Sequence, residues 1–145
     1  MEFGEITEVV PWDVMALTCA QDLTAAQVKE PRLFKSHCEH AKIAKGGKYI
    51  YVARNPDDAF VSFFKFLPAY VGLREDDITM YQFADAIFAK TASHNGTIWD
   101  HYNGWYDVKD DPNVLWVFFE APAPVRLSPR RIASVDSDSA LLWLS

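Results

Sequence analysis

The stretch GKYIYVARNPDDAFVSFFKF, from Gly47 to Phe66, contains a strand that is expected to turn directly into a helix. Its aromatic and β-branched run, residues 49–53, is typical of a buried strand. Asn55 then suits a helix N-cap and Pro56 the first helical position, so a helix is expected over 57–68. A strand, a tight turn and a helix make half of a βαβ unit, and α/β proteins bind ligands at such strand ends.

Arg54 and Ser62 lie where such a unit would meet a ligand. Arg54 directly follows the strand, and Ser62 lies about two turns into the helix. An arginine can hold a phosphate through its bidentate guanidinium, and a hydroxyl can add a hydrogen bond. The residues alone leave a second interpretation open, in which Arg54 pairs with Asp57 or Asp58 and Ser62 faces solvent.

Length and composition restrict the class of protein. The 145 residues are 50% hydrophobic and 14% aromatic, which suits one globular domain with a filled core. No run reaches the ~20 apolar residues of a membrane helix, and the N-terminus lacks a secretory signal pattern, so no membrane partner is expected. Cys19 and Cys38 make no disulfide framework, which favours a reducing cytoplasm. A net charge of −6 argues against nucleic acid as a partner.

Hydrophobic periodicity and helix caps predict the remaining elements. An α/β alternation with a parallel sheet is expected, with strands over 32–36, 48–53 and 114–119 and helices over 57–68, 79–92 and 97–109. Residues 1–30 are expected to be mostly helical, with one helix opening at Pro11 and a second capped by Thr24. Trp12 lies at helical spacing in the first of these and is interpreted as a core residue rather than a ligand contact.

Three segments, in chain order, resemble the cytosolic sulfotransferases, a family that uses 3′-phosphoadenosine 5′-phosphosulfate (PAPS). They are PRLFKSH (31–37), YIYVARNPDDAFVSFFKF (49–66) and GTIWDHYNGWYDVKDDPNVLWVFFE (96–120). The resemblance implies the sulfotransferase variant of the fold of P-loop-containing nucleotide hydrolases, a parallel sheet flanked by helices. Residues 1–145 would then be a partial sulfotransferase domain, matched best over 31–120, with an atypical, proline-containing tail over 121–145.

The resemblance also implies roles for particular residues. His37 matches the catalytic base, and Lys35 matches the cation beside the transferring group. Arg54 and Ser62 match the residues that bind the 3′-phosphate of PAPS. His101 matches a histidine that can line the acceptor pocket, while a helix-packing role is equally open. The implied acceptor is a small molecule that presents a hydroxyl or an amine.

The family's phosphosulfate-binding loop has no counterpart in these residues, and no Walker motif is present. The chain is therefore expected to be a truncated sulfotransferase with weak or no activity. The alternative is a non-catalytic nucleotide-binding remnant or a regulatory pseudoenzyme. The same loss is expected to remove a central strand and to leave an unpaired edge, beside the 48–53 strand or its neighbour, that permits self-association. No metal is expected, because the ligands clustered over 37–40 lack the separated pairs of a zinc site.

Overall fold

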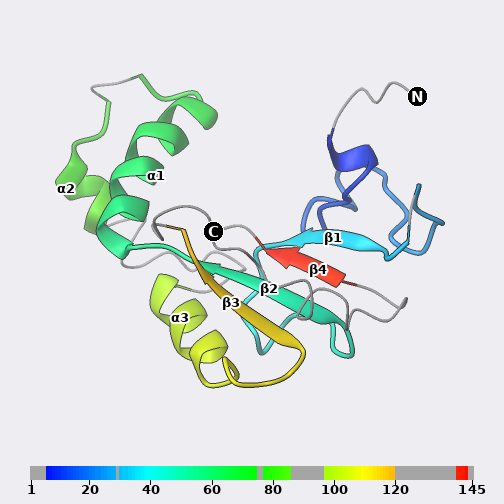
Figure 1. Ribbon diagram of the computed structural model, residues 1–145. Helices are drawn as coiled ribbons and strands as arrows, with labels where there is room; N and C mark the ends of the chain where they lie inside the picture. The colour runs from blue at the N-terminus through cyan, green and yellow to red at the C-terminus, as the bar shows by residue number, and fades with distance from the viewer. Residues whose placement is uncertain (1–5, 29, 75–76, 86–96, 120–139, 144–145) are drawn as a thin grey trace.

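A parallel sheet forms the centre of the computed structural model, which describes residues 6–28, 30–74, 77–85, 97–119 and 140–143 (Figure 1). Its strands are β1 (Leu33–Ser36), β2 (Lys48–Ala53), β3 (Val114–Phe118) and β4 (Ala140–Trp143). In space their order is β1-β4-β2-β3, and every pairing between neighbours is parallel. The predicted α/β architecture with parallel strands is confirmed.

β2 is the strand on which the core is built. Its side chains alternate between one fully buried face, formed by Tyr49, Tyr51 and Ala53, and one half-buried face. Helix α3 (Ile98–Tyr106) packs on the buried face, where Trp105 stacks on Tyr51 with ring centroids 5.3 Å apart. A strand buried on both faces, as β2 largely is, reads as a continuous apolar run, which is the pattern that the sequence shows.

The helices begin at the caps that the sequence predicts. The Asn55 side chain accepts a hydrogen bond from the Asp57 amide at the start of α1 (Pro56–Tyr70), which continues two residues past Pro68. Thr79 forms a capping box with Gln82 before α2 (Met80–Phe83). The remainder of the helix expected over 79–92 lies mostly outside the described residues.

The helical prediction for residues 1–30 is wrong for the part that the structure describes. That part contains only a short 3-10 helix, η1 (Ile6–Glu8), followed by turns. Trp12 forms a parallel bridge with Lys35, so the chain around it runs beside β1 and cannot coil into a helix. Asp22 accepts hydrogen bonds from the Thr24 amide and hydroxyl, and this local turn replaces the helix that Thr24 was expected to cap.

The unpaired edge that was expected beside the 48–53 strand or its neighbour does not lie on β2 itself, whereas the neighbouring β3 is an edge of the described sheet. β2 pairs with β3 on one side and with β4 on the other. β4 comes from the tail that departs from the family pattern, and its apolar sequence ALLW suits a strand in the middle of a sheet. The edges of the described sheet are instead β1 and β3.

The Trp105 stack leads to a stability prediction with a control on the same helix. Trp105 is 1% exposed and Trp99 is 55% exposed. Trp105→Ala is expected to lower the free energy of unfolding by about 3–5 kcal/mol, as for other buried aromatics. Trp99→Ala is expected to change it by no more than about 0.5 kcal/mol. Urea unfolding followed by circular dichroism measures both, and equal losses would contradict the assigned packing.

Candidate functional site

The candidate residues follow strands that end at the same edge of the sheet. Lys35 lies in β1 and His37 directly follows it, while Arg54 directly follows β2. Both strands run parallel to β4, so their carboxyl ends point the same way. This edge is where open α/β sheets bind ligands.

His37 and Lys35 share one aromatic neighbour, Trp12. The imidazole of His37 meets the Trp12 ring edge to face, with centroids 4.9 Å apart. The Lys35 ammonium lies 4.1 Å from the centroid of the same ring, within cation–π range. The buried indole N–H of Trp12 has no hydrogen-bond partner in the part of the chain that the structure describes. Trp12 thus lies against both residues for which the family resemblance implies catalytic roles.

This environment keeps His37 uncharged. Burial, together with smaller contributions from the positive charge of Lys35 and from His101, lowers the pKa of His37 from its ordinary 6.5 to about 4. Near neutral pH the imidazole is therefore a free base, while the lysine beside it carries a positive charge. A neutral base next to a fixed cation can accept a proton while negative charge is stabilised nearby.

Arg54 is held from two sides at the end of β2. Its guanidinium carbon lies 4.8 Å from the centroid of the Phe119 ring. The hydroxyl of Tyr102, from α3, donates a hydrogen bond to the Arg54 carbonyl oxygen. The residue is half-buried, so the structure restrains its backbone and packs its side chain on an aromatic ring.

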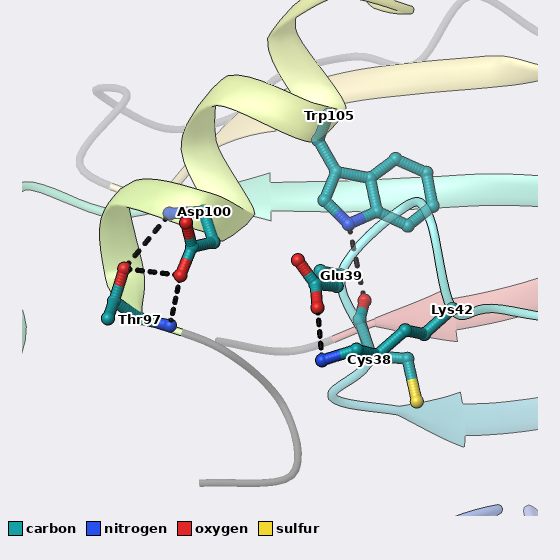
Figure 2. A network of polar contacts seen from close by, with 6 residues as sticks. All are labelled: Cys38, Glu39, Lys42, Thr97, Asp100 and Trp105. Atoms are coloured by element: carbon teal, nitrogen blue, oxygen red, sulfur yellow. Dashed lines mark hydrogen bonds and ion pairs between the residues drawn. The ribbon is translucent and has the colours of Figure 1, made fainter. Parts of the chain in front are cut away.

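Helix α3 also reaches the segment that follows β1. Figure 2 shows Trp105 directed at this segment, where its indole N–H donates to the carbonyl oxygen of Cys38 at 3.3 Å. Glu39 and Lys42 form an ion pair within the same segment. The helix starts at a capping box between Thr97 and Asp100, in which the Thr97 amide donates to the Asp100 carboxylate at 2.8 Å.

The structure places Lys35, His37 and Arg54 at one edge of the sheet. His101 is 7% exposed on α3 and lies near enough to His37 to influence its pKa. Ser62 is exposed on α1, so a cavity shared with Arg54 stays a prediction. Trp12, which was expected in a helix, instead bridges to Lys35 and contacts His37, and its interpretation as a core residue rather than a ligand contact stays a prediction. The phrase VVPWDVM, which resembles the family region before the catalytic strand, was the available signal.

A protein-family model described as a sulfotransferase domain matches residues 8–122. The chain belongs to the sulfotransferase domain family. The matched range includes β1, β2, β3 and every residue placed at the candidate site above. It ends before β4, so the strand in the middle of this sheet comes from outside the match.

Individual sulfotransferases match parts of the chain at moderate identity. An amine sulfotransferase of Oryctolagus cuniculus is 38% identical over 96 residues, which cover 62% of this chain and 31% of that protein. A 3-alpha-hydroxysteroid sulfotransferase of Cavia porcellus is 30% identical over 115 residues, which cover 76% of this chain and 38% of that protein. Cytosolic sulfotransferase 12 of Arabidopsis thaliana is 29% identical over a stretch that covers 68% of this chain and 32% of that protein. The chain therefore spans about a third of the length of the curated relatives it matches.

Two further findings concern the described part of this sulfotransferase chain. Its described residues contain no group of three or more His, Cys, Asp or Glu side chains placed to hold a metal ion. Among those same residues, no helix combines the length and apolar character needed to cross a bilayer.

The uncharged state of His37 can be tested by titration. We expect the His37 C2 proton to titrate near pH 4 in NMR spectra. Lys35→Gln should raise this midpoint by removing a nearby positive charge, whereas Lys65→Gln, at an exposed position of α1, should leave it unchanged. Because the folded pKa lies below the unfolded value, the stability that His37 provides is present above pH 6.5 and declines as the pH falls toward 4. A midpoint near 6.5 in the folded chain would contradict the assigned environment.

Proposed function

We propose that this chain is part of a cytoplasmic enzyme that transfers a sulfuryl group from PAPS to the hydroxyl or amine of a small-molecule acceptor. The observation that supports this best is the placement of Lys35, His37 and Arg54 at one edge of a parallel sheet, in a chain of the sulfotransferase domain family. The names of two relatives include an amine and a hydroxysteroid, so the proposal extends to this class of acceptor and not to one compound.

The donors at this edge fit a ligand that carries separated anionic groups. Lys35 and Arg54 carry positive charge on strands that lie on either side of β4, and two strand spacings amount to about 10 Å. Asp57 and Asp58 place negative charge in the first turn of α1. A 3′-phosphate would therefore be held by the Arg54 guanidinium, together with Ser62, rather than by the start of the helix.

The proposed mechanism assigns one task to each residue. Sulfuryl transfer resembles phosphoryl transfer, in which positioning and charge stabilisation dominate a loose transition state. When bound, PAPS would supply the sulfuryl group: the bond from its sulfur to the bridging oxygen would break as the bond to the acceptor forms, and adenosine 3′,5′-bisphosphate would leave. The neutral imidazole of His37 accepts the proton of the acceptor hydroxyl or amine. The Lys35 ammonium stabilises the negative charge that develops beside it, Trp12 limits the access of water to both, and His101 contacts the acceptor.

A second function is nucleotide binding without turnover. Arg54 packs on Phe119 and its carbonyl accepts a hydrogen bond from Tyr102, and neither contact involves His37 or Lys35, so nucleotide binding can be separated from transfer. An assay with radiolabelled PAPS and a panel of phenols, alcohols and amines separates the two functions. Transfer that His37→Ala abolishes supports the enzyme, and binding without transfer supports the nucleotide-binding remnant.

Nucleotide recognition can be tested separately from chemistry. The chain is expected to bind adenosine 3′,5′-bisphosphate, and Arg54→Ala should weaken that binding by about 1.5–3 kcal/mol, as for a hydrogen bond to a charged group. Arg74→Ala removes an equal charge from an exposed position after α1 and should leave the affinity unchanged. Isothermal titration calorimetry measures both variants. Equal affinities for Arg54→Ala and the unsubstituted chain would exclude Arg54 from the site.

A further inference from the structure

β4 lies between the two strands that carry the candidate site. On one side its residues align with β1, from Leu33 with Ala140 to Ser36 with Trp143. On the other side they align with β2, from Lys48 with Ala140 to Ile50 with Leu142. Figure 1 shows β4, in red, between the two strands. In the described sheet β1 and β2 are not neighbours, so β4 joins their backbones.

The register fixes how the two strand ends are offset. Leu142 aligns with Lys35 on one side and with Ile50 on the other, so these two residues lie at the same level across β4. His37 lies two residues beyond Lys35, and Arg54 lies four residues beyond Ile50. Arg54 is therefore about two residues, or roughly 7 Å, further along the strand direction than His37.

The backbone of β1 faces β4 at alternate residues. The Lys35 amide donates to Pro11 at 2.8 Å and its carbonyl accepts from Asp13 at 3.0 Å, so both groups point to the outer edge of the sheet. Their neighbours in the strand, Phe34 and Ser36, therefore direct their backbone groups toward β4. On β2, the Tyr49 amide donates toward β3, to Asn113 at 2.8 Å, and Ile50 faces the opposite side, toward β4.

We propose that β4 is a positioning strand for the candidate site: its pairing with both β1 and β2 holds the Lys35–His37 end and the Arg54 end at a fixed separation and offset. The significance of that site rests on the proposed function, whereas the role of β4 in the sheet does not. Trp105 and Tyr102 bind the segments that follow the strands, and β4 holds the strands themselves. The segment that does this lies outside the family match, so this sulfotransferase chain supplies the strand from its own tail.

The test is hydrogen exchange of the full chain with Leu142→Pro, with Leu142→Val as the matched control. Proline removes the amide of Leu142 from the ladder, while valine keeps it and suits a strand. In Leu142→Pro the amides of Phe34, Ser36 and Ile50 should exchange roughly tenfold faster or more. The amides of Lys35 and Tyr49 should keep most of their protection, and Leu142→Val should match the unsubstituted chain.

Each other outcome overturns the proposal. Unchanged exchange at Phe34 and Ser36 would show that β4 does not hold β1. An equal loss of protection from exchange at the amides of Tyr49 and β3 would show that β4 supports the whole fold rather than the relative position of β1 and β2. The His37 midpoint gives a separate signature, since it should move toward its ordinary value in Leu142→Pro and stay unchanged in Leu142→Val. No ligand is used, so a chain that shows this pattern but fails to bind the bisphosphate refutes only the proposed function.

A disulfide provides a second measurement that does not depend on proline. In a background of Cys19→Ser and Cys38→Ser, the pair Leu33→Cys and Ala140→Cys joins aligned residues of neighbouring strands, about 4.8 Å apart. This pair should oxidise within one chain. The pair Leu33→Cys and Leu142→Cys is displaced by two residues, beyond the ~7 Å limit for a disulfide, and should not. Equal oxidation of both pairs, or of neither, would contradict the register on which the proposal rests.

Discussion

The stack of Trp105 on Tyr51 is the contact on which the arrangement of the site depends. Both rings are 1% exposed, and they lie at 23° to each other in the centre of the core. Burying two large aromatic rings against each other is worth several kcal/mol, more than any polar contact described here. This contact fixes the rotation of α3 about its axis and therefore the directions of His101 and Tyr102, one turn away on the same helix.

From that position α3 contacts both halves of the candidate site. Trp105 donates to Cys38 beyond β1, and Tyr102 donates to Arg54 beyond β2. His101 contributes to lowering the pKa of His37, for which burial is the main cause. Helix α3, which packs on the sheet, and strand β4, which lies within it, thus both fix the position of the end of β1 relative to the end of β2. The helix does so through side-chain hydrogen bonds and the strand through backbone pairing. The Lys35–His37 end of β1 and the Arg54 end of β2 are thus held by packing and by backbone pairing.

The sequence predicted what local chemistry determines. Asn55 and Thr79 act as the expected N-caps because a side-chain oxygen can satisfy a free amide in the first turn, and β2 is a strand because its apolar run is continuous. The helix expected around Trp12 was wrong because helical spacing carries no information about the long-range bridge from Trp12 to Lys35. β4 was missed for a similar reason. Its short apolar run becomes a strand only because β1 and β2 lie on either side of it, and that is a property of the tertiary fold.

The claim that β1 and β2 end in one ligand site is tested most directly by NMR. An isotope-labelled chain is titrated with adenosine 3′,5′-bisphosphate while the backbone amides are followed. We expect the signals of Ser36 and His37 to shift together with those of Arg54 and Asn55, and both groups to yield the same dissociation constant. Shifts confined to one strand end, or different constants for the two ends, would contradict a single site.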